Sequence, residues 1–258
     1  MKVLKKIFKS SLIFIIVIVI WQLTWNAGIY NRSLFPSPLQ TVKALWYEIT
    51  QDNLYLHIGA SMSRYMTGYI IAAVLAVFLG LIFGYYTKSW EFVNPLVQFI
   101  RPISPIAWMP FIVLWFGIGD IPADVVIFIA AFFPILLSTV SAVRNVDRVY
   151  LRVASNFDIS TGKTLMKIIF PAAFPQIMNG FHMACGTAWI FLVAGEMIGT
   201  QSGLGYLIID ARNNLRTDIL AAVIIVIGLI GLGIDALMKY LENLVKEKWG
   251  FGILEKSR

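Results

Sequence analysis

Charge and cysteine are scarce in this 258-residue sequence, and each shortage excludes a class of protein. Charged residues make up only 14% of the chain, against about 25% in an average soluble domain, while 59% of the residues are hydrophobic. One water-soluble core of this length could not bury so much apolar surface, and a disordered chain would need low hydrophobicity. The single cysteine, Cys185, allows no internal disulfide and no cysteine-based metal cluster. The composition therefore predicts an all-α integral membrane protein in a lipid bilayer.

Uncharged runs long enough to cross a bilayer, about 20 residues each, recur along the chain. The first run follows four lysines, as in a signal peptide, but it is longer than a usual signal sequence and no small-residue cleavage site follows it, which favours a retained helix. The third run is interrupted by Arg101 and three prolines, and we interpret it as one kinked span. We predict a transmembrane domain at 10–245 with six spans, at residues 10–31, 65–87, 92–117, 122–143, 168–198 and 218–240.

The basic residues predict the orientation of these spans. If the N-terminal segment 1–9 is cytoplasmic, 15 of the 21 Lys and Arg residues fall on the inner side and five on the outer side, with Arg101 inside a span. This asymmetry follows the positive-inside rule, and an odd number of spans would remove it. We therefore expect a multi-pass protein of the plasma membrane, with the N-terminus and the tail 246–258 in the cytoplasm. The net charge of +7 is then a topology signal, and no nucleic-acid partner is expected.

The cytoplasmic loop 144–167 carries the most informative local pattern. Apolar residues recur there at helical spacing and predict a short amphipathic helix: Val146, Val149, Val153 and Phe157. Asp158 follows where the chain must turn, and Asp tolerates the left-handed conformation. Ser160 is placed to cap a second helix that runs through Lys167, and Gly162 softens its start. Gly162-Lys163-Thr164 also resembles the end of a phosphate-binding loop, but Phe157 stands at the required first glycine, so no nucleotide cofactor is expected in this chain.

This loop resembles the EAA motif of ABC importer permeases. Arg152-Val153-Ala154 stands at the E-A-A positions, Asp158 at the glycine, and Ile168-Ile169-Phe170-Pro171 at the closing element. Further stretches resemble the nitrate/sulfonate/taurine-type branch of these permeases: 34–38 (LFPSP), 106–110 (IAWMP), 114–119 (LWFGIG), 132–134 (FFP), 171–175 (PAAFP), 195–197 (GEM) and 203–208 (GLGYLI). The basic residue at the acidic position and the Asp at the glycine depart from the motif. They imply an altered turn and a dedicated ATPase partner with an acidic groove.

The resemblance implies a division of labour among several chains. Two permease copies, as a homodimer, would form the pathway, two cytoplasmic ATPase subunits would bind ATP-Mg, and an extracytoplasmic binding protein would deliver the solute. This chain would hold no catalytic residue, cofactor or metal. Its ATPase-coupling loop would use a set of residues in and after the amphipathic helix: Arg148, Val149, Arg152, Val153, Ala154, Phe157, Asp158, Ser160, Gly162 and Pro171.

The solute class and its rivals also follow from this resemblance. We expect a small anionic or zwitterionic solute such as nitrate, a sulfonate or taurine, with a vitamin-precursor pyrimidine as the alternative. A secondary transporter is a weaker alternative, because no inverted repeat is visible between the two halves. A membrane hydrolase that uses His182 and Glu196 lacks both zinc-ligand spacing and a nucleophile elbow.

Ionisable groups inside spans are candidates for the pathway or for gating, because charge in hydrocarbon is costly. Arg101 could meet an anionic substrate or pair with a carboxylate. Glu196 is expected to support the loop that contains Gly203 and Gly205, and His182 is expected to be a hydrogen-bonded packing residue. Small residues also form two stripes at helical spacing, which we interpret as helix-packing surfaces: Ala72, Ala76, Gly80 and Gly84 in the second span, and Gly180, Ala184 and Ala188 in the fifth.

Overall fold

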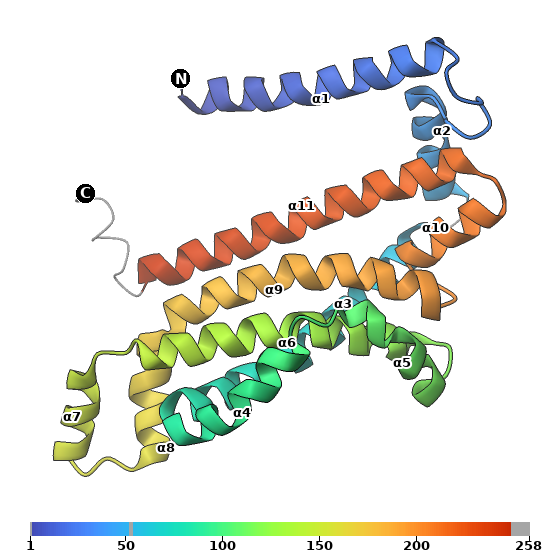
Figure 1. The fold of residues 1–258 in the computed structure, drawn as a ribbon. Coiled ribbons are helices and arrows are strands. Elements are labelled where there is room, and N and C mark those ends of the chain that lie inside the picture. Colours follow the sequence, from blue (N-terminus) through green and yellow to red (C-terminus); the bar gives the residue numbers. More distant parts are fainter. Residues whose placement is uncertain (1, 52–53, 249–258) are drawn as a thin grey trace.

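The computed structural model describes residues 2–51 and 54–248, and these residues form an all-helical chain (Figure 1), which confirms the predicted class. In chain order the elements are α1 (Lys2–Asn26), α2 (Pro38–Thr50), α3 (Leu54–Tyr85), α4 (Thr87–Ile100), the 3-10 helix η1 (Pro105–Trp108), α5 (Met109–Phe116), α6 (Asp120–Arg144), α7 (Arg148–Asn156), α8 (Thr161–Thr164), the π-helical turn η2 (Leu165–Ile169), α9 (Phe170–Gly199), α10 (Leu204–Asn213) and α11 (Thr217–Lys248). The predicted tail 246–258 lies outside the described residues from 249 onward, and so does the side chain of Arg148.

Helices α3 and α6 run parallel and in close contact at the centre of the bundle. Near the middle of α3, Gly68 lies so close to Ile127 of α6 that an added Cβ would meet the Ile127 Cβ at 2.9 Å. Near the end of α3, Gly84 lies against Val143 in the same way. Along this contact the residue numbers of α3 and α6 increase in the same direction, so the two helices are parallel. The chain between them must therefore return along the length of the bundle.

Residues 86–119 make this return as two helical pieces. Helix α4 and the η1–α5 segment are bent by 82° at the break 101–104. Pro102 lies within this break and Pro105 directly follows it, and neither can donate the backbone hydrogen bond that would continue the helix. The bend is sharper than the kink that we predicted for the span at 92–117.

Four described helices are long and apolar enough to cross a membrane, or five if the bent α4–α5 pair counts as one span. A further, shorter apolar helix covers Leu12–Asn26. The spanning helices extend beyond several predicted limits, since α3 begins at Leu54 and α11 continues to Lys248. The count of six spans stays a prediction.

Helix α9 continues without a break from the second helix of the cytoplasmic loop. We expected that helix to run through Lys167 and to join the span at 168–198 directly, and α8, η2 and α9 form one helical stretch, Thr161–Gly199. The π-helical turn at Leu165–Ile169 lies directly before Pro171. A π turn widens the backbone where a proline ring would otherwise meet the carbonyl four residues earlier, so the helix bends but does not end there. Figure 1 shows this change of direction between α8 and α9.

The predicted small-residue stripes lie inside this chain. Ala72 and Ala76 are fully buried, and an added Cβ on Gly80 would meet the Thr139 Cβ of α6 at 2.6 Å. On α9, Gly180 lies against Ser138, while Ala184 and Ala188 are fully buried. Their positions tie α3 and α9 to α6 over most of the bundle.

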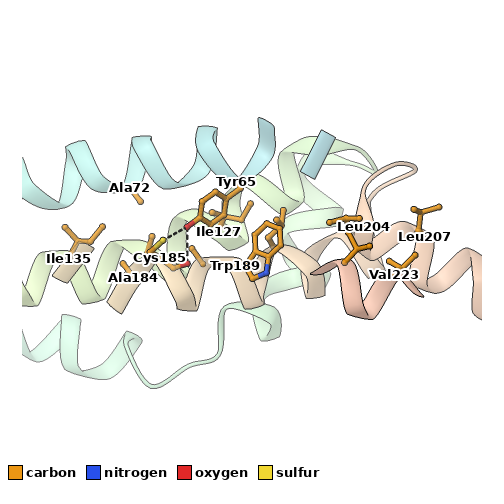
Figure 2. Close-up of a cluster of buried hydrophobic side chains, with 14 of the residues drawn as sticks. Tyr65, Ala72, Ile127, Ile135, Ala184, Cys185, Trp189, Leu204, Leu207 and Val223 are labelled. Carbon is orange, nitrogen blue, oxygen red and sulfur yellow. Dashed lines mark hydrogen bonds between the residues drawn. The ribbon is translucent and has the colours of Figure 1, made fainter. Parts of the chain in front are cut away.

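Between these small residues, larger side chains such as Tyr65 and Trp189 fill the space between the helices (Figure 2). The Tyr65 hydroxyl lies 2.9 Å from the Cys185 Sγ atom and donates to the Cys185 carbonyl oxygen at 3.1 Å. Trp189 stacks edge-on against Tyr65, and its indole N–H donates to the Ile227 carbonyl of α11 at 3.2 Å. These contacts join α3, α9 and α11 in one packed unit.

Candidate functional site

A groove opens between α6, α9 and the break that separates α4 from η1. It has two neighbouring compartments, of about 570 and 280 Å³, which share Arg101, Pro134 and Thr187 as lining residues. Because Arg101 lies at the end of α4, the broken segment forms one wall, and the long helices α6 and α9 form the others. The groove therefore runs along α6 and α9.

Neutral polar side chains line the larger compartment. They come from one face of α6 and one face of α9: Ser138, Ser141, Gln176, Asn179 and Thr187. The Ser138 hydroxyl donates to the Gln176 carbonyl, and the Thr187 hydroxyl donates to the Met183 carbonyl. Within the described residues, the side-chain amides of Gln176 and Asn179 make no hydrogen bond, and Asn179 is exposed. The groove thus presents hydrogen-bond donors and acceptors on helices that are otherwise apolar.

Arg101 is the charged residue of this groove. It follows the last residue of α4, where its backbone N–H donates to the Val97 carbonyl at 2.9 Å, and its side chain is exposed. The carbonyl end of a helix favours a cation, so this position suits a permanently charged guanidinium. Among the described residues, no carboxylate lies within ion-pair distance of Arg101. The structure therefore does not supply the carboxylate partner that was one of our two expectations for it.

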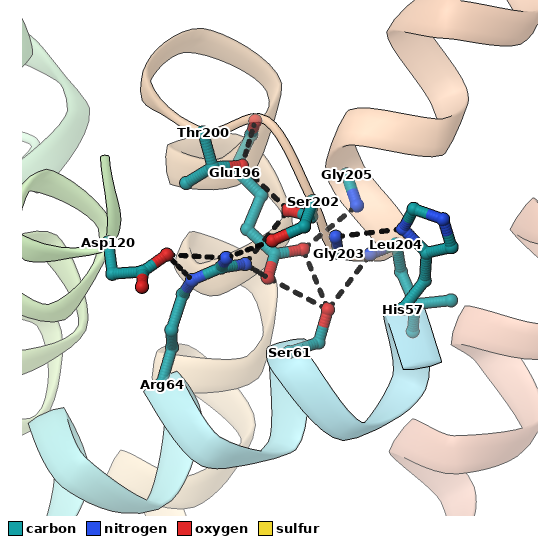
Figure 3. Close-up of polar contacts among 10 residues, drawn as sticks. All are labelled: His57, Ser61, Arg64, Asp120, Glu196, Thr200, Ser202, Gly203, Leu204 and Gly205. Atoms are coloured by element: carbon teal, nitrogen blue, oxygen red, sulfur yellow. Dashed lines mark hydrogen bonds and ion pairs between the residues drawn. The ribbon is translucent and has the colours of Figure 1, made fainter. Parts of the chain in front are cut away.

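A second polar cluster lies at the end of the bundle opposite α7 (Figure 3). We call it the outer clamp, and it consists of His57, Ser61, Arg64, Asp120, Glu196, Ser202 and the backbone of Gly203–Gly205. Arg64 Nη1 lies 2.7 Å from Glu196 Oε1, and both side chains are at least 95% buried. Arg64 Nε also donates to Asp120 Oδ1 at 2.8 Å, although the Asp120 side chain is 69% exposed. One arginine thus joins α3, α6 and α9.

The Glu196 carboxylate holds the turn that follows α9. Its Oε2 atom accepts the Gly205 N–H at 2.9 Å, and it also accepts the Ser61 hydroxyl at 2.8 Å. Ser61 in turn accepts the Leu204 N–H at 2.9 Å, and the His57 Nδ1 atom accepts the Gly203 N–H. The side chains of Glu196, Ser61 and His57 therefore each satisfy one backbone donor at the start of α10.

Two glycines make room for this carboxylate. Gly203 has a φ of +106°, and a Cβ at this position would overlap the Glu196 carboxyl group. A Cβ on Gly205 would lie 2.6 Å from the Glu196 Cβ. The G-x-G spacing is therefore required by the position of Glu196, and these three residues act together at the turn.

The sequence alone does not identify all members of the outer clamp. It singles out Glu196, Gly203 and Gly205, but it leaves Arg64 as one of several outer basic residues. A signal was present, because Arg64 is the sole Lys, Arg, Asp or Glu in the long stretch 54–87. A single charge at the end of an apolar run predicts a buried partner, although it does not say which one.

His182 does not line the groove. It faces α11, where its Nε2 lies 2.9 Å from Asp235 Oδ1 and its Nδ1 lies 2.9 Å from Glu242 Oε2. The ring is 28% exposed and bridges α9 to α11. Within the described residues, no group of three or more His, Cys, Asp and Glu side chains is arranged to hold a metal ion. The geometry of His182 is that of a link between two helices.

Helix α7 projects at the opposite end of the molecule and exposes an apolar face. The side chains of Val149, Val153 and Phe157 are 56%, 46% and 75% exposed, while Ala154 is buried against the bundle. Asp147 begins the helix, because its carboxylate accepts the Val149 N–H at 2.9 Å. An exposed apolar face of this kind indicates a surface for a protein partner.

The turn after α7 has the conformation that the sequence predicts. Asp158 has a φ of +48°, and the next residue, Ile159, donates its N–H back to the Ala154 carbonyl at 3.0 Å. Ser160 precedes α8, but its side chain makes no capping hydrogen bond, contrary to our expectation. Gly162 lies exposed in α8, and Pro171 lines a cavity of about 780 Å³ beside α7. Arg152 is exposed on α7.

Comparison with known proteins places this geometry in a family. Residues 72–247 match the family described as the inner membrane component of binding-protein-dependent transport systems. A chain named as an ABC transporter permease protein in Methanocaldococcus jannaschii is 38% identical over 184 residues, which cover 71% of this chain and 69% of the relative.

Two further relatives are named for their solutes. The aliphatic sulfonates transport permease protein named in Bacillus subtilis strain 168 is 30% identical over 93% of this chain and 87% of its own. The nitrate import permease protein of Leptolyngbya laminosa is 30% identical over 95% of this chain and 89% of its own. An inward-facing structure of the MetNI methionine ABC transporter matches with a TM-score of 0.56 at 15% identity, over 80% of this chain and 96% of the matched one, which shows a shared fold.

Proposed function

The chain belongs to the inner membrane components of binding-protein-dependent transport systems, in their nitrate-, sulfonate- and taurine-type branch, and on this basis we propose its solute class and its mechanism. It is a permease subunit of an ABC importer and a multi-pass membrane protein, and its relatives are transport permeases. The proposed solute is small and anionic or zwitterionic, like those named for the nitrate and sulfonate relatives. The companion binding protein would largely determine which solute is transported.

The polar groove between α6 and α9 is the observation that carries this proposal. A solute that crosses a bilayer needs polar partners along its path, because hydrocarbon offers none. The groove provides five neutral polar side chains on α6 and α9, which are long enough to span a membrane, and one cation at the end of α4. It is open on one side, and a second copy of the chain would close it. The functional unit is therefore a homodimer with the pathway between its subunits.

Coupling to ATP is assigned to α7. Two cytoplasmic ATPase subunits bind ATP-Mg and each receives one α7, with Val149, Val153 and Phe157 in a groove and Arg152 at its rim. Since α7 connects the end of α6 with the helical stretch that contains α9, a displacement of α7 tilts α6 and α9. The extracytoplasmic binding protein delivers its solute at the opposite end, beside the outer clamp. Six spans, with both chain ends cytoplasmic, complete this arrangement.

ATP-dependent uptake into liposomes tests the proposal. The permease is reconstituted with its companion ATPase and binding protein, and labelled nitrate, ethanesulfonate, taurine and a neutral hydroxymethyl-pyrimidine are offered in turn. We expect accumulation of one of the three charged solutes with ATP, and none with a non-hydrolysable ATP analogue. Accumulation that persists without ATP would indicate a secondary transporter. Accumulation of the pyrimidine alone would favour the vitamin-precursor alternative.

A further inference from the structure

Arg101 differs from Arg64 and His182 in what surrounds it. Arg64 contacts two carboxylates, those of Asp120 and Glu196. His182 lies between two further carboxylates. Arg101 instead lines a cavity whose other described lining residues are all uncharged. The four carboxylates that pair with Arg64 and His182 are therefore already engaged elsewhere.

An unpaired guanidinium on the wall of this groove has hydrogen-bond donors that a ligand could use. Charge inside a membrane protein usually faces a cavity and pairs with another charge or with polar groups. Arginine presents several N–H donors in a planar fork that matches the two oxygens of an oxyanion, and it stays charged at every physiological pH. The carbonyl end of α4 stabilises the positive charge of Arg101 itself, and the attraction for an anion comes from the guanidinium. The guanidinium is thus poised to bind an anion.

The groove next to Arg101 supplies further donors for the same ligand. Gln176 and Asn179 lie three residues apart on α9 and line the larger compartment, and Thr187 lines both compartments. Neither amide is used by another described side chain or backbone group. Amide N–H groups can donate to an anion, and their carbonyl oxygens can accept from an ammonium group. The lining therefore accepts a bare oxyanion or the anionic end of a zwitterion.

We propose that Arg101, with Gln176 and Asn179, forms a transit site that holds the oxyanion group of the solute between the two ends of the permease. The inference rests on the proposed import function and adds to it a residue-level site and a chemical class, the small oxyanion. The position of Arg101 in the break 101–104 places the site at the bend of the crossing segment. At this site, charge-assisted hydrogen bonds to Arg101 replace the hydrogen bonds that the solute otherwise makes to water.

Uptake by charge variants is the first part of the test. The assembled importer is compared with Arg101→Gln, Arg101→Lys and the matched control Lys88→Gln, which removes a positive charge from the same helix outside the groove. We expect Arg101→Gln to lower uptake of the transported anion by about 10- to 100-fold, the size of a lost charged hydrogen bond. Arg101→Lys should retain part of the rate, and Lys88→Gln should retain nearly all of it. ATP hydrolysis in the absence of binding protein should be unchanged in the control Lys88→Gln.

Chemical protection of Arg101 is the second part and does not depend on transport. The detergent-solubilised importer is treated with phenylglyoxal, and the modification of each arginine is followed by peptide mass spectrometry. Nitrate or ethanesulfonate should slow the reaction at Arg101 but not at the exposed Arg152, and Gln176→Leu with Asn179→Leu should weaken this protection. Equal reactivity of Arg101 with and without both anions would overturn the site.

The outcomes separate the two levels of the proposal. Anion import that is unaffected in Arg101→Gln would overturn the transit site and leave the import function intact. A wild-type importer that accumulates none of the charged solutes with ATP would contradict the proposed function itself. Import of the anion that falls with Arg101→Gln, together with selective protection of Arg101, supports both.

Discussion

At the scale of single residues, three side chains show three ways to handle charge at membrane depth. Arg64 forms a buried ion pair with Glu196, His182 bridges two carboxylates, and Arg101 faces a polar groove. Removing one partner of a buried pair leaves an uncompensated charge, whereas an exposed partner is replaced by water. The two carboxylates on Arg64 therefore contribute very differently to stability.

Substitution of each carboxylate in turn measures this difference. Glu196→Gln should lower the free energy of unfolding by about 3–5 kcal/mol, because Arg64 loses its buried partner. Asp120→Asn, on the same arginine but 69% exposed, should cost less than about 1 kcal/mol. Thermal unfolding of the purified protein in detergent compares the two, and hydrogen exchange at the Gly205 amide should accelerate in Glu196→Gln alone. Equal losses in both variants would contradict the role of burial.

The sequence predicts part of the outer clamp for a clear reason. An acid such as Glu196 at the end of an apolar run needs partners, and the nearby Gly203 and Gly205 suggest a tight turn. Its principal partner, Arg64, is 132 residues away, and only the antiparallel packing of α3 against α9 brings them together. A local sequence pattern cannot show a contact between residues so far apart in the chain. The same limit applies to the groove, whose lining residues show no shared motif in the sequence.

At the scale of elements, helix α7 is the clearest case of a prediction that local pattern supports. Its apolar spacing gives a helix at Arg148–Asn156, and the turn at Asp158 follows from side-chain chemistry. The second helix joins the fifth span as expected, but the sequence did not predict the π turn at Leu165–Ile169 through which α8 continues into α9. The hydrophobic periodicity of a sequence does not reveal a single π turn. The bend at 101–104 was similarly underestimated, since prolines mark a break but do not set its angle.

Phe157→Asp tests the assigned role of α7. The ring is 75% exposed, so a charge there should leave folding intact but weaken the ATPase contact by at least about 10-fold, as for an aromatic at the centre of an interface. The measurement is retention of the ATPase during purification, together with ATP hydrolysis stimulated by the loaded binding protein. Leu215→Asp is the control for retention of the ATPase, because Leu215 is 74% exposed and lies between α10 and α11, at the end opposite α7. Unchanged stimulation in Phe157→Asp would reject the coupling role.

At the scale of the whole molecule, the basic residues separate along the long axis. The cationic helix α7 and the last turns of α11 lie at one end, and α2 and α10 lie at the other (Figure 1). This separation is the three-dimensional form of the positive-inside pattern in the sequence, and it predicts that the α7 end is cytoplasmic. The composition alone was sufficient for the membrane class, because too few charges are present to cover a soluble surface.

Cysteine accessibility in intact cells tests this orientation. Lys43→Cys in α2 should react with a membrane-impermeant maleimide from outside, while Lys163→Cys in α8 should react only after the cells are permeabilised. Cys185 is 3% exposed, so the unsubstituted protein provides a low background. Both native lysines are exposed, which makes the two positions comparable. Labelling of Lys163→Cys in intact cells would reverse the predicted topology.

The tight packing of α3, α6 and α9 also has a mechanical consequence. Helix α9 contains 30 residues, and at about 1.5 Å per residue it is a rod of about 45 Å with α7 near one end and the outer clamp at the other. A tilt of roughly 5° would move the far end of such a rod by about 4 Å, which is comparable to the width of a small oxyanion. The glycine contacts with α6 limit bending between Gly180 and Gly199, so in the proposed mechanism a small rotation at α7 would reach the outer clamp as a displacement of this size. Helix α9 would then act as a lever arm, and a small rotation could take the place of a large rearrangement.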